Sequence, residues 1–148
     1  MQPSGTRFTQ LVKKLRQRGY RITPQRAAIL KVLTESPDHP SVEQVYAAVS
    51  PDFPMTSLAT VYKTINMLKE EGEVLELGFA NESSRYDGSK PYPHPHLICV
   101  RCQRIIDPEI DQFDGLSREL AQKYGYQILN QRVDFFGVCP VCQAREAT

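Results

Sequence analysis

The four cysteines of this 148-residue chain occur as two Cys-X-X-Cys pairs, with no cysteine left over. The first pair is Cys99 and Cys102, and the second is Cys139 and Cys142. Each pair lets two thiolates reach one tetrahedral ion from a tight turn, and two pairs complete a closed, structural zinc site. Disulfides and a redox dithiol are the alternatives, which a cytoplasmic chain and the absence of a fifth cysteine disfavour. The pattern therefore predicts structural Zn²⁺.

The three histidines form a second set, His39, His94 and His96. In an extended segment His94 and His96 point to the same side, because side chains repeat every second residue. Asp87 and Asp107 flank this pair and offer hard oxygen ligands. Such a mixture of nitrogen and oxygen donors suits Fe²⁺ or Mn²⁺ and also admits Zn²⁺, Co²⁺ or Ni²⁺. The spacing alone leaves ordinary solvated or hydrogen-bonded histidines open.

Composition and charge limit the class of protein. A hydrophobic content of 41% permits a packed core and disfavours global disorder. The sequence has no apolar run near the roughly 20 residues that span a bilayer and no apolar signal core, so we expect a cytoplasmic chain without membrane contact. The net charge of +1 divides into +4 for residues 1–72 and −3 for residues 73–148. This asymmetry fits a DNA-contacting half joined to another domain, although chance clustering on a solvated surface gives the same numbers.

The first half predicts four helices followed by a β-hairpin. Helices are expected over residues 7–18, from Pro24 through Leu33, over 41–49, and from Ser57 until Gly72 stops the last one, with Thr23, Ser41 and Ser57 as N-caps and Gly19 ending the first. Strand-like segments follow at 74–79 and 84–87. The apolar stripe of the fourth helix is predicted to comprise Leu58, Val61, Ile65 and Leu68. Helices followed by a hairpin are typical of a winged helix-turn-helix.

The solvent face of the fourth helix carries small, polar and aromatic side chains suited to base edges and phosphates in a major groove. This face is predicted to comprise Thr56, Ser57, Ala59, Thr60, Tyr62, Lys63 and Asn66.

The second half begins after a hinge-like, proline-rich stretch at 89–93. We expect strands at 96–100 and 104–107, a helix at 111–124 and a strand at 126–136. The fold class predicted is therefore α+β, with a winged-helix DNA-binding domain at 1–88 and a small α/β dimerisation and metal-binding domain at 89–148. Zinc would tie the start of the second domain to its end, which so small a core needs.

Five motifs, in order, resemble those of the ferric-uptake-regulator family, and the resemblance covers about residues 7–142. They are Arg21–Arg26, His39–Tyr46, Ala59–Ile65, His94–Cys102 and Gly137–Cys142. The resemblance implies a homodimer that represses by binding palindromic, AT-rich double-stranded DNA operators when a regulatory metal is bound.

The resemblance also implies site residues. The regulatory Fe²⁺ or Mn²⁺ would be held by His39, Asp87, His94, His96 and Asp107. The expected DNA contacts are Arg26, Ser57, Thr60, Tyr62 and Lys63. An enzyme with His94, His96 and a carboxylate as a facial triad is disfavoured, because no histidine or cysteine remains for a nucleophile pair. A zinc-ribbon interaction module without a sensing role is another alternative.

Departures from the family pattern indicate which branch of the family this chain resembles. Prolines at 93 and 95 replace the His and Asp of an additional metal site, which puts that site in doubt. No free cysteine is present for the sensing site of a zinc-uptake regulator. Asp107 resembles the peroxide-sensing branch, in which a ligating histidine is oxidised, here His39 or His94. Control of iron, manganese or zinc uptake without peroxide sensing is the alternative.

Overall fold

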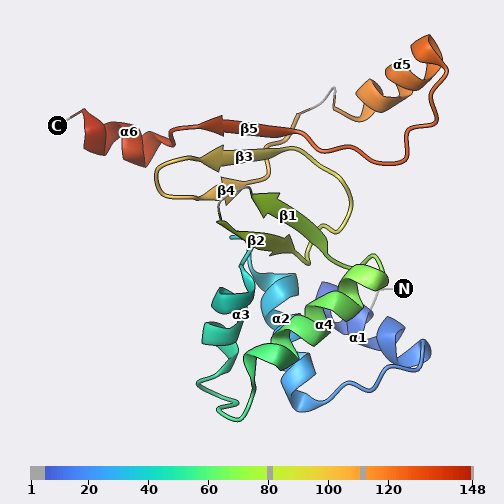
Figure 1. Ribbon diagram of the computed structural model, residues 1–148, viewed down its shortest axis with the longest axis vertical. Coiled ribbons are helices and arrows are strands. Elements are labelled where there is room, and N and C mark those ends of the chain that lie inside the picture. The colour runs from blue at the N-terminus through green and yellow to red at the C-terminus, as the bar shows by residue number, and fades with distance from the viewer. Residues whose placement is uncertain (1–5, 80–81, 111–112, 148) are drawn as a thin grey trace. The chain divides into compact units, whose positions relative to one another are not determined.

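The computed structural model describes residues 6–79, 82–110 and 113–147, which form two compact units. The first unit extends to Tyr92 and the second begins at Pro93. The first contains α1 (Arg7–Gln17), α2 (Pro24–Glu35), α3 (Val42–Val49), α4 (Leu58–Glu70), β1 (Leu75–Phe79) and β2 (Glu82–Asp87), as Figure 1 shows. The second contains β3 (His96–Cys99), β4 (Ile105–Ile106), α5 (Asp114–Tyr124), β5 (Asp134–Gly137) and α6 (Pro140–Glu146). No helix within the described ranges is long and apolar enough to cross a membrane.

The predicted helix starts are confirmed by their caps. The side chains of Thr23, Ser41 and Ser57 each accept a hydrogen bond from the backbone N–H three residues on. Ser41 also completes a capping box with Gln44. Gly72, just beyond α4, has a φ of 69°, a conformation that glycine adopts without strain.

The core of the first unit is a single cluster contributed by all four helices, by Val74 just before β1 and by Tyr86 of β2. Its fully buried members include Leu15, Leu30, Val45 and Val61. Two predictions about α4 were wrong. Leu58, assigned to the apolar stripe, is 39% exposed at the first helical position, and Thr56, assigned to the solvent face, is buried one residue before the cap.

The hairpin of the first unit pairs β1 and β2 antiparallel, as expected, and completes the winged-helix order. Residues 80 and 81, between the two strands in the sequence, lie outside the described residues. A third segment joins this hairpin, because Ser41 forms an isolated bridge with Arg85 and the Tyr86 N–H donates to the Pro40 carbonyl. The loop that carries His39 is thereby fixed to β2.

The second unit contains a three-stranded sheet in the order β4-β3-β5. β3 pairs antiparallel with β4 and parallel with β5, so the chain crosses over between β3 and β5 through α5. The predicted strand at 126–136 was wrong for most of its length, since only 134–137 form a strand and residues 126–133 have no ladder partner. The described part of the predicted helix at 111–124 begins at Asp114, and residues 111 and 112 lie outside the described residues. α6 was not predicted.

Glu73, just after α4, connects that end of the first unit to α1. Its carboxylate accepts hydrogen bonds from Arg7, at 2.9 Å, and from Lys14. The Arg7 guanidinium also donates to the Glu73 backbone carbonyl at 2.8 Å. Burial acts to raise the pKa of the Glu73 carboxyl, but Lys14 and Arg7 outweigh it and hold the pKa below its ordinary value. The ionised form of Glu73 is therefore stabilised in the folded state.

We expect Glu73→Gln to lower the free energy of unfolding by about 1–2 kcal/mol near neutral pH, because charge-assisted hydrogen bonds are lost. A depressed folded-state pKa contributes stability above the unfolded pKa that disappears as the pH falls through the folded value. Urea unfolding of both proteins at decreasing pH should therefore show the difference shrinking in acid. Glu70→Gln, at an exposed position of α4, is the control and should unfold like the wild type. A Glu73→Gln deficit that stays constant into acid would contradict the assignment.

Candidate metal centres and DNA-binding face

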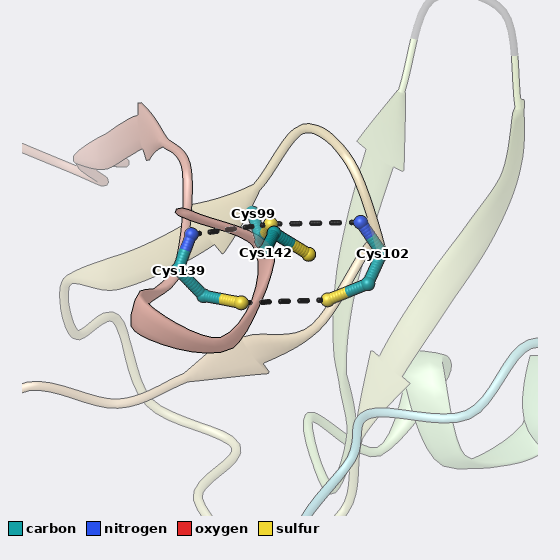
Figure 2. Close-up of side chains that lie close together, drawn as sticks. All are labelled: Cys99, Cys102, Cys139 and Cys142. Carbon is teal, nitrogen blue, oxygen red and sulfur yellow. Dashed lines mark hydrogen bonds between the residues drawn. The ribbon is translucent and has the colours of Figure 1, made fainter. Parts of the chain in front are cut away.

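The four cysteines meet in the second unit (Figure 2). Cys99 ends β3, Cys102 lies in the turn that follows, Cys139 is the N-cap of α6 and Cys142 lies within α6. Their sulfur atoms all lie within 4.8 Å of one another, and those of Cys102 and Cys139 are 3.8 Å apart. Thiolates about 2.3 Å from a tetrahedral zinc ion are separated by about 3.8 Å. The arrangement fits a four-thiolate zinc site.

Backbone N–H groups converge on the Cys99 sulfur. Those of Arg101, Cys102 and Cys139 lie 3.4, 3.5 and 3.3 Å from it. The N–H groups of Cys102 and Cys139 lower the pKa of the Cys99 thiol to about 6. Hydrogen bonding to Cys139 and burial raise the pKa of Cys142 to about 12. In the absence of a cation, the cluster thus favours ionisation of Cys99 but opposes ionisation of Cys142. A divalent cation would offset the negative charge of additional thiolates.

The first unit contains a His–Asp pair. His39 Nε2 lies 3.1 Å from Asp87 Oδ2, and both side chains are almost fully buried. His39 Nδ1 lies 3.2 Å from the Pro37 carbonyl, so an Nδ1–H there donates to that oxygen and leaves the Nε2 lone pair facing the carboxylate. The backbone of His39 has a φ of 54°, and Arg85 holds this loop by donating to the carbonyls of His39 and Asp38.

The two carboxylate oxygens of Asp87 have different partners. Oδ1 accepts three hydrogen bonds of 2.9 Å, from the Ser89 N–H, the Ser89 hydroxyl and the Lys90 N–H. Oδ2 faces His39. The loop after β2 therefore fixes the orientation of the Asp87 carboxylate and directs one oxygen toward the imidazole.

The second unit contains two histidines and an aspartate whose side chains lie close together. Asp107 Oδ1 lies 3.2 Å from His94 Nε2 and 3.6 Å from His96 Nε2. The two imidazole rings have centroids 4.4 Å apart. Asp107 follows β4, whose Ile106 pairs with Leu97, so the antiparallel register brings Asp107 beside His96. Donor atoms about 2.1 Å from an octahedral cation lie roughly 3.0 Å apart, so the His94–Asp107 separation suits ligation by both.

Four of the five residues expected to contact DNA lie on α4 or at its N-cap. Ser57, Tyr62 and Lys63 are exposed, and Thr60 is partly exposed. The Ser57 and Thr60 hydroxyl oxygens are 3.0 Å apart. Arg26 lies on α2, where its guanidinium donates to the Arg21 carbonyl at 2.7 Å.

Two polar contacts at the histidines were not found from the sequence. Arg85 holds the His39 loop from the neighbouring strand, and Asp134 Oδ1 lies 3.5 Å from His96 Nδ1. The sequence separation of each residue from its histidine gives no sign that the two are neighbours. Only strand register brings each one to its histidine.

A helical unit that ends in a winged hairpin is followed by an α/β unit with four clustered cysteines. Together with the match to a family of regulators, this arrangement assigns the chain to the metal-dependent transcriptional regulators. Residues 17–136 match the ferric uptake regulator family, and the chain belongs to this family. It is 39% identical over 132 residues to the peroxide-responsive repressor PerR of Staphylococcus aureus, covering 89% of this chain and 88% of the relative.

Solved structures are similar over almost the whole chain. The Campylobacter jejuni peroxide stress regulator is 31% identical with a TM-score of 0.70, covering 90% of this chain and 98% of its own. The Helicobacter pylori ferric uptake regulator Fur is 25% identical with a TM-score of 0.77, covering 97% of both chains.

Gly88, directly after Asp87, lies in a confined position. A Cβ added there would lie 2.7 Å from the Leu33 backbone carbonyl oxygen, closer than such atoms approach. The Gly88 carbonyl also accepts a hydrogen bond of 2.9 Å from Arg7. The chain therefore packs directly on α2 where it leaves the Asp87 carboxylate.

Gly88→Ala should lower the free energy of unfolding of the first unit by about 1–3 kcal/mol, because α2 or the loop must move to admit the methyl group. Gly78→Ala is the control, since a Cβ at that exposed position of β1 meets only the Ser84 hydroxyl at 3.9 Å. Chemical denaturation followed by far-ultraviolet circular dichroism measures both. Equal denaturation midpoints for the two variants would show that the close approach does not constrain the loop.

Proposed function

We propose that this chain is a homodimeric repressor that binds palindromic, AT-rich operators and senses hydrogen peroxide through Fe²⁺ or Mn²⁺ at a His/Asp site. The observation that carries the proposal is the pair of His–Asp contacts, His39 with Asp87 at 3.1 Å and His94 with Asp107 at 3.2 Å. Both pairs offer imidazole nitrogen and carboxylate oxygen, which suit Fe²⁺ and Mn²⁺.

The structural metal in this proposal is Zn²⁺, held by Cys99, Cys102, Cys139 and Cys142. The 3.8 Å contact between the Cys102 and Cys139 sulfurs supports it, as does the depressed pKa of Cys99. Zinc would neutralise the charge that the cluster cannot accumulate as free thiolates. This site would close the second unit and take no part in sensing.

The regulatory site in this proposal comprises His39, Asp87, His94, His96 and Asp107. Metal would bind the DNA-binding form more tightly than other forms, and the resulting shift toward that form can be no larger than the difference in affinity. The bound metal would supply the redox chemistry, while the protein residues orient the donor atoms.

Peroxide sensing is supported by the similarity to peroxide-responsive repressors and by aspartate at both carboxylate positions. In the oxidation step, hydrogen peroxide would transfer one oxygen atom to a ring carbon of His39 or His94, and the other oxygen would leave as water. The imidazole loses the two electrons that peroxide gains. An oxidised ring is a weaker ligand, so metal and operator would be released.

The proposed dimer is supported by apolar residues on the sheet of the second unit. Leu97 pairs with Ile106 on one side and with Phe135 on the other, and all three are between 42% and 47% exposed. A row of this kind across three strands is typical of an interface. Operator contacts are proposed for Arg26, Ser57, Thr60, Tyr62 and Lys63, with two recognition helices matching half-sites one turn apart.

Cys99→Ser should abolish zinc binding and unfold the second unit, because zinc binding and folding are coupled in a site of this kind. Val100→Ala, an exposed change within the same Cys-X-X-Cys turn, is the control and should retain one zinc per chain. Metal analysis and circular dichroism of both proteins measure the effect. A folded, zinc-free Cys99→Ser dimer would contradict the structural role.

The sensing proposal is tested by anaerobic operator titration of zinc-loaded protein with Fe²⁺ and, separately, with Mn²⁺. Each titration is repeated after a brief hydrogen peroxide pulse and followed by peptide mass spectrometry. We expect the iron form alone to lose operator affinity and to gain one oxygen on His39 or His94. His39→Ala should abolish the metal dependence, whereas Tyr62→Ala should weaken operator binding at unchanged metal content. Iron-loaded protein that keeps its operator and intact histidines would instead identify an iron-, manganese- or zinc-uptake regulator.

A further inference from the structure

The buried imidazole of His96 lies between two carboxylates. Its Nε2 is 3.6 Å from Asp107 Oδ1, and its Nδ1 is 3.5 Å from Asp134 Oδ1. His96 is 1% exposed, and the side chains of Asp107 and Asp134 are 17% and 11% exposed. The two ring nitrogens therefore face different acids, of which only Asp107 belongs to the proposed ligand set.

Strand register places Asp134 at this position. β3 and β5 are parallel neighbours in which His96 is the partner of Asp134, and the His96 N–H donates to the Val133 carbonyl at 3.1 Å. Paired residues of adjacent strands project their side chains to the same face of the sheet. The contact is thus fixed by the backbone of the sheet rather than by a loop.

The second oxygen of Asp134 has its own cationic partner. Arg132 Nε donates to Asp134 Oδ2 at 2.7 Å. The Arg132 side chain is 41% exposed, so its guanidinium remains in contact with water while it holds the carboxylate. Arg132 offsets the charge of Asp134 and leaves Oδ1 directed at the imidazole.

We propose that Asp134 is a positioning residue for the regulatory metal, acting through His96; the inference rests on the proposed function of His96 as a ligand. In the metal-bound protein Asp134 would accept a hydrogen bond from the Nδ1–H of His96 and so leave the Nε2 lone pair on the side of Asp107. A carboxylate behind a ligating imidazole fixes its tautomer and orientation and raises its basicity. The present 3.5 Å separation exceeds the about 2.9 Å of a formed N–H···O bond, so we expect it to shorten when the ring ligates metal.

The test measures Mn²⁺ affinity of the full-length, zinc-loaded protein by competition with a chelating dye. Asp134→Ala should weaken binding about 10–100-fold. Asp134→Asn should recover part of that loss, because its amide oxygen still accepts from Nδ1–H. Glu119→Gln, which removes one exposed charge from α5, is the control and should bind Mn²⁺ like the wild type.

A second readout separates positioning from a general structural role. With Zn²⁺ at both sites, the wild type should show a downfield imidazole N–H resonance that is protected from exchange and is lost in His96→Ala and in Asp134→Ala. Loss of Mn²⁺ binding in His96→Ala with unchanged affinity in both Asp134 variants would overturn this inference alone. Unchanged Mn²⁺ affinity in His96→Ala would overturn the proposed site and the inference with it.

Discussion

Three backbone N–H groups point at the Cys99 sulfur, and they come from both ends of the second unit: Arg101 and Cys102 follow β3, whereas Cys139 precedes α6. The same sulfur cluster joins the last residue of β3 to the helix after β5, beside a parallel pairing of only four residues in each strand. Few large apolar side chains are buried among the described residues of this unit, and they include Ile98, Ile105 and Phe113. The order of the sheet therefore depends on the cluster, and so does the position of every side chain that the sheet supplies to the histidines.

The first unit is held together differently. Its helices share a continuous apolar core, and its His–Asp pair is a local product of that packing. Arg85 and Asp87 lie two residues apart on β2, so one strand both holds the His39 loop and supplies the carboxylate beside the imidazole. Gly88 then allows the chain to lie against α2. The proposed metal ligands His39 and Asp87 are thus held together by a strand of the same hairpin that forms the wing.

The sequence predicted the first unit well because caps and helical apolar stripes are local signals. Thr23, Ser41 and Ser57 each begin a helix as expected. The second unit was harder, since β5 is defined by a partner almost 40 residues earlier, and the partial alternation of residues 126–133 is not matched by any ladder. The cysteine pairing and the His–Asp set follow from residue type and family resemblance. The place of Asp134 behind His96 does not, because a register between distant strands has no signature in spacing.

The separation of the cysteine pairs also sets an order of events during synthesis. Cys102 and Cys139 are 37 residues apart, and translation proceeds at about 5–20 residues per second, so roughly 2–7 seconds pass between them. All core residues of the first unit have been synthesised before the first cysteine pair. In that interval the emerging chain offers zinc only two thiolates, which cannot form a closed tetrahedral site. If the cluster holds zinc as proposed, tight binding therefore becomes possible only when α6 has left the ribosome.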